Sequence, residues 1–118
     1  MDAEALKELV VKYFKYMGYE VEDNVQLEGH SGMIYNFDML MSKGDDKRLV
    51  FVRDWKRTVG VNMILKLDKA AEDVGITDPV FVATQFSDHA KAYANRKKIT
   101  IIPEQKLLLF FKKASEPT

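Results

Sequence analysis

The second half of the chain carries the feature that most constrains the fold, a regular alternation of short apolar runs with amphipathic segments. The runs LVFV, PVFVA and ITII are rich in β-branched and aromatic residues. Near-continuous runs of this kind are typical of strands that are covered on both faces, as in a parallel sheet. The spacer segments have apolar residues at helical spacing or a Ser cap. The pattern predicts a βαβαβ unit with strands at 49–55, 78–84 and 99–102 and helices at 61–74 and 88–97.

The first half is organised differently, as one helix followed by strands. Apolar residues recur at helical spacing from Leu6 to Met17, and Gly18 stands where a C-terminal cap belongs. Period-2 alternation then indicates two strands, of which the first is expected to be irregular near Asp23. The two strands lie at 19–27 and 33–41, and the polar hairpin turn that leads to the third strand lies at 42–47.

Together the two halves predict one α/β domain over residues 1–112, with the element order αβββαβαβ. An antiparallel meander enters a parallel half, so the sheet is mixed and flanked by helices. The segment 104–111 closes the domain, and its pattern does not separate helix from strand. Core packing is the first interpretation of the apolar run 107–111, and a homodimer interface is the alternative. Residues 113–118 are predicted to be a disordered tail.

Composition excludes several classes of protein. The chain of 118 residues has 18 basic and 18 acidic residues, so no overall positive field indicates nucleic acid, although a local basic face stays open. It has no Cys, which excludes disulfides and thiolate metal sites and favours a cytoplasmic location. No apolar run approaches the roughly 20 residues of a membrane span, so no membrane partner is expected.

Two carboxylates and a lysine are expected to gather at the end of the third strand. Alternation places Asp54 and Lys56 on one face there, together with Val50 and Val52. Asp38 lies in an otherwise apolar strand, where a carboxylate is costly to bury unless it is paired or binds a metal. A hairpin would bring Asp38 towards Asp54. Carboxylate oxygens select hard cations such as Mg²⁺, and a metal-activated water with a lysine beside it suits phosphodiester hydrolysis.

The local pattern also has plainer interpretations. Asp-x-Lys is a weak motif that occurs again in the polar turn at 45–47, where it only increases solubility. A surface ion pair contributes little, and a buried ion network in an unrelated α/β protein is a further alternative.

The alternation of the second strand predicts that one face carries Tyr35, Phe37, Met39 and Met41, and that the other carries Ile34, Asn36, Asp38 and Leu40.

Longer stretches resemble a known family. KELVVKYFKYMGYEVE resembles the opening helix and strand of the PD-(D/E)xK nuclease superfamily, GHSGMIYNFDML its Gly-rich approach to the first metal-binding Asp, and LVFVRDWKR its strand with the second acid and the lysine. PVFVATQFSDHAKAYANRKKITII resembles the second half of the Mrr-type branch and of the related archaeal Holliday-junction resolvases. The resemblance covers about residues 4–108 and implies a restriction-endonuclease-like fold.

The same resemblance implies roles for individual residues. Asp38 and Asp54 would bind Mg²⁺ or Mn²⁺ together with the backbone carbonyl of Trp55, and Lys56 would be the catalytic lysine. Ser31 falls where resolvase relatives often place a functional serine. DNA would be the substrate.

Two positions depart from the family pattern. The acid before the lysine is often Glu or Gln, and here it is the shorter Asp54. Many relatives have a metal-binding Glu in the first helix, whereas the aligned position here is Lys7. Glu8 is one residue away, about 100° around the helix, and is an accessory candidate.

Further candidates flank the proposed site. Gln85 follows the strand at 78–84, at the carboxyl end where open α/β sheets place their sites. A solvated charged face is an equal alternative for the predicted DNA-phosphate contacts, which are Arg53, Arg57, Thr58, Lys66 and Lys69.

The sequence therefore predicts a metal-dependent DNA endonuclease, Mrr-like or junction-resolvase-like. The alternative is a catalytically inactive nucleic-acid-binding or assembly module on the same fold. The neutral charge and the departure at Lys7 motivate that alternative.

Overall fold

The structure is a computed structural model that describes residues 3–54 and 56–115. Its helices and strands follow the order predicted from the sequence, with one further helix at the end. In chain order they are α1 (Ala3–Tyr16), β1 (Glu20–Glu28), β2 (Ile34–Lys43), β3 (Asp46–Arg53), α2 (Val61–Val74), β4 (Val80–Ala83), α3 (Asp88–Lys97), β5 (Thr100–Pro103) and α4 (Glu104–Ser115).

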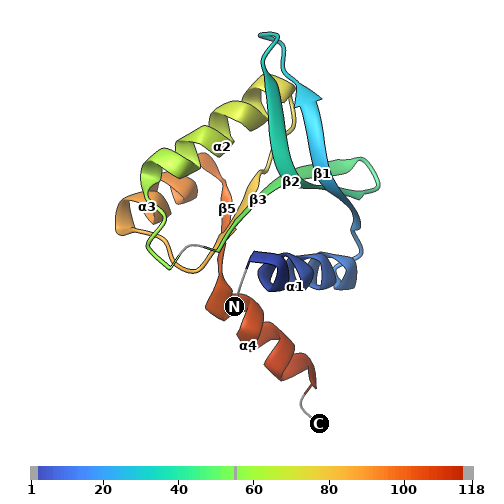
Figure 1. Cartoon of the computed structure of the whole chain (residues 1–118), viewed down its shortest axis with the longest axis vertical. Helices are drawn as coiled ribbons and strands as arrows, with labels where there is room; N and C mark the ends of the chain where they lie inside the picture. Colours follow the sequence, from blue (N-terminus) through green and yellow to red (C-terminus); the bar gives the residue numbers. More distant parts are fainter. Residues whose placement is uncertain (1–2, 55, 116–118) are drawn as a thin grey trace.

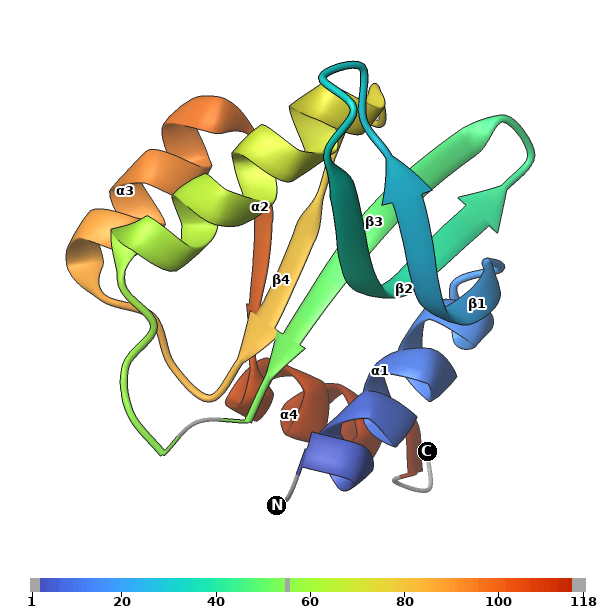
Figure 2. The same ribbon diagram turned by 45° about the horizontal axis from the view of Figure 1, so that its top comes forward.

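The strands form one mixed sheet in the order β1-β2-β3-β4-β5. The first three strands pair antiparallel, and β3, β4 and β5 pair parallel. Parallel neighbours need a crossover, which α2 and α3 provide. Figures 1 and 2 show α2 and α3 against one face of the sheet and α1 and α4 towards the other. The predicted fold class, a mixed sheet flanked by helices, is confirmed.

Each face of the sheet has its own hydrophobic core. On one face, Leu67 of α2 and Phe81 of β4 are fully buried in a cluster that includes α3. On the other face, Leu6 and Val10 of α1 pack in a second cluster with Leu107 of α4. The strands between them are buried on both sides, which explains why their sequences are apolar without alternation.

β2 does not keep one apolar face, and the expected alternation is wrong in this strand. Tyr35 and Phe37 pack in the cluster under α2, whereas Met39 and Met41 belong to the cluster under α1. The side chains therefore change sides between Phe37 and Met39. A strict period of two holds only where a strand continues without a bend.

The bend lies at Asp38. β2 pairs with β3 only from Met39, which faces Val50, so residues 34–37 pair with β1 alone. On β1, Asn24 lies between the residues that pair with the two neighbours of Asp38, and its φ is 49°. This left-handed conformation is uncommon for a non-glycine residue and accompanies the bend. The irregularity expected near Asp23 is thus present, at the level where the pairing of β2 with β3 stops.

The hairpin between β2 and β3 is tighter than predicted. Lys43 pairs with Asp46, which leaves Gly44 and Asp45 as a two-residue turn. Gly44 has a φ of 62°, which glycine adopts without strain. β3 consequently begins and ends earlier than the predicted 49–55, and Asp54 is the first residue after the strand rather than part of it.

The C-terminal segment is a helix packed beside α1. Leu107 is fully buried while Leu108 and Leu109 are 45% and 51% exposed, as expected of an amphipathic helix. Phe110 makes edge-on ring contacts with Tyr13 and Tyr16. The helix includes residues 113–115, which corrects the predicted start of a disordered tail. Residues 116–118 lie outside the described part.

Candidate active site at the break between β2 and β3

The carboxylate of Asp38 fills the break that the bend leaves in the ladder. Its Oδ2 accepts a hydrogen bond of 2.7 Å from the backbone N–H of Val52, which β2 no longer reaches. The same oxygen accepts one of 2.9 Å from Nη1 of Arg53, and Oδ1 lies 3.2 Å from Nζ of Lys7. The side chain of Asp38 is only 16% exposed. Both oxygens of this half-buried carboxylate are thus paired. This pairing offsets the cost of burying a carboxylate in an apolar strand.

Arg53 is held in place by more than this ion pair. Its guanidinium also donates to the backbone carbonyl of Val52 at 2.9 Å and lies over the Phe51 ring, 4.9 Å from the centroid. These contacts fix the guanidinium beside Asp38. Arg53 was predicted to contact DNA phosphate, and in this structure its Nη1 binds the Asp38 carboxylate.

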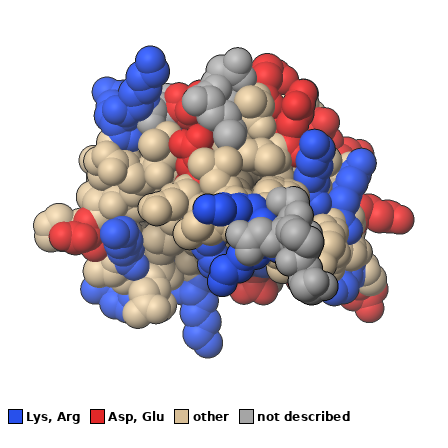
Figure 3. All heavy atoms as spheres, turned by 90° about the horizontal axis from the view of Figure 1, so that it is seen from below, with Lys and Arg blue, Asp and Glu red and all other residues tan. Residues whose placement is uncertain are grey.

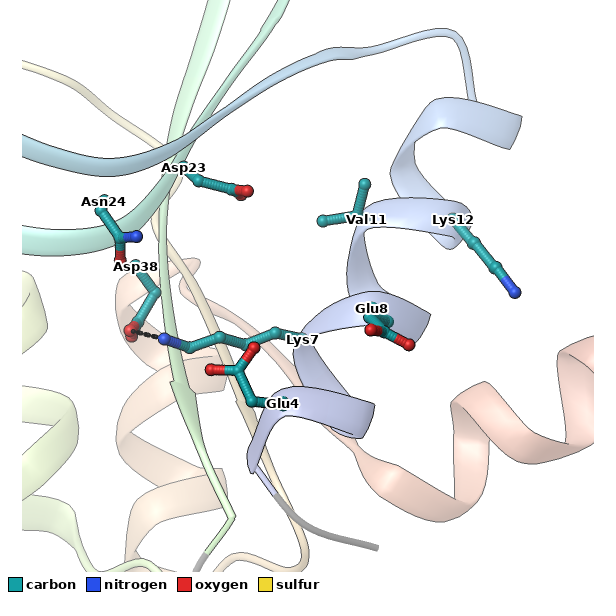
Figure 4. A pocket seen from close by; sticks show the side chains of 8 residues that line it. All are labelled: Glu4, Lys7, Glu8, Val11, Lys12, Asp23, Asn24 and Asp38. Atoms are coloured by element: carbon teal, nitrogen blue, oxygen red, sulfur yellow. Dashed lines mark ion pairs between the residues drawn. The ribbon is translucent and has the colours of Figure 1, made fainter.

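Lys7 contacts Asp38 from the first turns of α1, whereas Arg53 contacts it from β3. Figure 4 shows its side chain extended from the helix towards Asp38, across a pocket of about 430 Å³. Glu4 and Glu8 also line this pocket, but the carboxylate of Glu8 points away from Asp38. The accessory role predicted for Glu8 therefore has no support from the geometry, because Lys7 is the α1 residue that contacts Asp38.

Asp54 differs from Asp38 in having no partner within the described part of the chain. It follows β3 directly and is half-buried, and it makes no hydrogen bond or ion pair with any other described residue. It comes two residues after Val52, a span of about 7 Å in extended chain, so both carboxylates belong to this end of β3. Lys56 is exposed and likewise pairs with nothing in the described part of the chain. Trp55, whose carbonyl was predicted to be a ligand, lies outside the described residues.

The loop after β3 is tied to the loop between β4 and α3. Val59 forms a parallel bridge with Phe86, and the Gln85 side chain donates to the hydroxyl of Thr58 at 2.7 Å. Gln85 and Thr58 are both exposed, and neither is hydrogen-bonded to the carboxylates. Arg57 is exposed in the same loop. These residues border the carboxyl end of the parallel strands but are not part of the Asp38 cluster.

Ser31, predicted as an accessory residue of the site, lies in a different place. It is in the loop between β1 and β2, where its backbone N–H and hydroxyl both donate to the carboxylate of Asp73, near the end of α2. Tyr35 donates to the same carboxylate at 2.8 Å. The backbone N–H of His30 also donates to the carbonyl of Asp73. We call Ser31, Tyr35 and Asp73 the hairpin latch, because they fasten the hairpin tip to α2.

The hairpin latch shifts the pKa values of two of its members. Hydrogen bonds from Ser31 and then Tyr35 hold the pKa of Asp73 below its ordinary value of 3.8. The bond to Asp73 raises the pKa of Tyr35 above 10.0. Both shifts follow because these hydrogen bonds favour the ionised carboxylate and the neutral phenol. Ser31 and Tyr35 both use their hydroxyls to join the β1–β2 segment to α2, so we interpret the latch as structural.

Charge on the surface is mixed. Lys66 and Lys69 are exposed on α2, on the face of the sheet opposite α1, and have no ion pair within the described chain. Figure 3, the view from the end where both termini lie, shows basic and acidic side chains interspersed rather than one basic surface. None of the described helices has the length and apolar character needed to cross a membrane.

The donor set fits a hard divalent cation in its chemistry. Among the described residues there is no group of three or more His, Cys, Asp or Glu side chains that could hold a metal. The predicted site needs only Asp38 and Asp54 from that group, completed by a carbonyl and waters. Asp54 offers carboxylate oxygens that no other described residue pairs with, and such oxygens suit Mg²⁺ or Mn²⁺. The charge of Asp38, by contrast, is already balanced by Lys7 and Arg53.

The sequence did not reveal the hydrogen-bond and ion-pair partners of Asp38 and Asp73. One sequence feature could have indicated the contact of Lys7 with Asp38, because Lys7 is aligned with an acid that lies close to the metal in relatives. Asp73 had no signal, because its partners are 42 and 38 residues away in the chain. The buried Gly29 lies so close to the Asp73 carboxylate that a Cβ there would overlap it, and this contact had no signal either.

Comparison with known proteins agrees with this architecture. The restriction endonuclease family Mrr_cat matches residues 1–111 of the chain. A solved protein of unknown function, AF1548, superposes with a TM-score of 0.77 at 19% identity over 92% of this chain and 65% of its own. A repair endonuclease from Pyrococcus abyssi does so with a TM-score of 0.55 at 13% identity, over 87% of this chain and 47% of its own.

The chain thus spans about two thirds of the first structure and less than half of the second. At these identities the two structures show a shared fold. No curated protein matches the sequence. The family match covers nearly the whole chain and agrees with the resemblance seen in the sequence, so the chain belongs to the restriction endonuclease family Mrr_cat.

Proposed function

We propose that this protein is a metal-dependent DNA endonuclease whose site is the pair Asp38 and Asp54 at the end of β3. The observation that carries the proposal is the half-buried Asp38 at the break between β2 and β3, in a chain of a nuclease family. Asp54 directly follows β3 and pairs with no other described residue. A carboxylate that interrupts a strand pairing has a structural cost, which a role in binding explains.

The residues divide into distinct roles. Asp38 and Asp54 would hold Mg²⁺ or Mn²⁺, with the Trp55 carbonyl as the third protein ligand. When bound, the metal activates a water and stabilises charge on the scissile phosphate. Lys56, exposed two residues after Asp54, is free to approach that phosphate or the attacking water.

DNA contacts are proposed for the basic and polar residues around this end of the sheet. Arg57 and Thr58 extend the loop after Asp54, and Lys66 and Lys69 are exposed on α2. Charged side chains of this kind bind phosphates and position the duplex without reading its sequence. The repair endonuclease among the structural neighbours supports DNA as the substrate class.

A second function is favoured by one observation. Asp38 is already paired with Lys7 and Arg53, as in a structural ion network. A catalytically inactive DNA-binding or assembly module on the same fold would keep such a network and lose the chemistry. Asp54 argues for the first proposal, because it pairs with no other described residue and an inactive module has no need of such a half-buried carboxylate.

The test is cleavage of labelled duplex, single-stranded and four-way-junction DNA with Mg²⁺, Mn²⁺ or EDTA. Cutting that requires the metal and is lost in Asp54→Ala would support the endonuclease. Asp45→Ala, which removes an exposed carboxylate in the β2–β3 turn, is the matched control. Binding without cutting, identical in wild type and Asp54→Ala, would favour the inactive module.

A further inference from the structure

We propose that Lys7 is a removable counter-ion of Asp38, which makes metal binding at this site depend on bound DNA. The inference rests on the proposed function, because it concerns the same carboxylate. It assigns a specific role to the residue at which this chain departs from its family pattern.

The partners of Asp38 are not equally removable. Oδ2 is held by a backbone N–H of β3 and by Arg53, which is itself fixed by the Val52 carbonyl and the Phe51 ring. Among the described residues, Oδ1 has one partner, the ammonium of Lys7 at 3.2 Å. That ammonium makes no other polar contact within the described chain, and the Lys7 side chain is 29% exposed. Lys7 is therefore the partner that can leave while the rest of the site stays in place.

Lys7 and a divalent cation would compete for the same oxygen. Oδ1 is the oxygen of Asp38 with the fewest donors, so it is the one available for direct coordination. An ammonium in contact with it both occupies that position and repels a second cation. The metal affinity of the free protein should therefore be low.

The pocket gives Lys7 room to move, and DNA would supply a reason to do so. The pocket of about 430 Å³ is lined by Asp38, Glu4 and Asp23 as well as by Lys7, whose side chain crosses it in Figure 4. A DNA phosphate that enters beside Asp38 is a second anion for the ammonium. Once Lys7 pairs with phosphate, Oδ1 is free for the metal. The coupling is reciprocal, so the metal should also strengthen DNA binding.

The first experiment measures Mn²⁺ affinity by titration calorimetry without DNA, in the full-length protein and its variants. Lys7→Met should bind Mn²⁺ about 10-fold more tightly than wild type, a typical size for coupling between sites. Lys7→Gln, which keeps a polar side chain, should do the same. Lys12→Met is the matched control, since Lys12 lines the same pocket without contacting Asp38. Its affinity should stay within about 2-fold of wild type.

The second experiment repeats the titrations with a saturating duplex that carries a non-hydrolysable backbone. DNA should increase the Mn²⁺ affinity of wild type about 10-fold more than that of Lys7→Met, because only wild type has a counter-ion to release. Equal increases in the two proteins would overturn the coupling.

Asp38→Ala separates the failure of this inference from failure of the proposed function. If Asp38→Ala abolishes Mn²⁺ binding while Lys7→Met leaves it unchanged, the role of Lys7 is refuted and the metal site stands. If Asp38→Ala binds Mn²⁺ as wild type does, both proposals are refuted. Thermal unfolding of each variant checks that it is folded in the titration.

Discussion

Asp38 and Asp73 are both half-buried aspartates that fasten one element to another, but they use different donors. Asp38 joins β2 to β3 and α1 through two cations and one strand N–H. Asp73 joins α2 to the β1–β2 hairpin through two hydroxyls and one backbone N–H, all neutral.

The difference indicates which aspartate is suited to function. Neutral donors orient a carboxylate without cancelling its charge, and here they hold it against the hairpin tip. Cationic donors cancel the charge, and one of them, the ammonium of Lys7, stands beside an open pocket. A metal ion or a phosphate can exchange with such a cation, whereas nothing in the hairpin latch is exchangeable in that way. We expect Asp38 to control activity and Asp73 to control stability.

The largest expected effect is on cleavage. Asp38→Ala should reduce the cleavage rate by about 10²–10³-fold or more, because a group that stabilises developing charge is lost. The protein should stay folded at a lower unfolding temperature, because the buried backbone N–H of Val52 loses its acceptor. Single-turnover cleavage and thermal unfolding measure both. An active Asp38→Ala protein would remove the proposed distinction between the two aspartates.

A substitution at the hairpin latch should have the opposite profile. A Cβ at Gly29 would overlap the Asp73 carboxylate, so Gly29→Ala must displace the latch. We expect the unfolding temperature to fall by about 5 °C or more, with cleavage below the transition changed less than about 2-fold. In an Asp73→Ala background the same substitution should have little further effect. A loss of cleavage in folded Gly29→Ala protein would contradict the structural role of the latch.

The pH dependence of stability should carry the signature of the hairpin latch. The pKa of Asp73 is lowered by Ser31 and Tyr35, so its contribution is fully present above pH 3.8 and is lost as the pH falls through the lower folded-state pKa. The pKa of Tyr35 is raised by Asp73, so its contribution is fully present below pH 10.0 and is lost as the pH rises through the raised value.

Unfolding temperatures measured across pH test this expectation. Tyr35→Phe should remove the decrease in unfolding temperature that Tyr35 causes at alkaline pH. It should also reduce the decrease at acid pH, because Asp73 keeps only its bonds to Ser31. Tyr16→Phe is the control, since the hydroxyl of Tyr16 has no hydrogen-bond partner in the described residues. Identical pH profiles for the two variants would show that the latch contributes little.

The smallest expected effect concerns the helix that carries Asp73. If α2 contacts DNA phosphates, Lys66→Met and Lys69→Met should each weaken binding about 2- to 3-fold and reduce the salt slope by about one. Fluorescence anisotropy at several salt concentrations measures this. An unchanged slope in both variants would restrict the DNA surface to the loop after β3 and the α1 side of the sheet.

Much of the architecture follows from local pattern. The bounds of α2 and α3 coincide with the predicted 61–74 and 88–97, because Gly75 and the Ser87 cap mark helix ends that are local in sequence. The parallel strands follow from apolar runs that only burial on both faces explains. The prediction failed in β2, since the bend at Asp38 depends on Asn24 in another strand and on where β3 stops pairing.

The sequence by itself determined the order of the elements, the family, and Asp38, Asp54 and Lys56 as the residues to consider, because these depend on periodicity and on a contiguous motif. Only the tertiary structure decided which groups meet. In the folded protein Lys7 of α1 contacts Asp38, Ser31 binds Asp73 instead, and Asp54 pairs with no other described residue. The physical reason is that ion pairs and hydrogen bonds form over about 3 Å, a separation set by how the helices pack on a bent sheet rather than by distance along the chain.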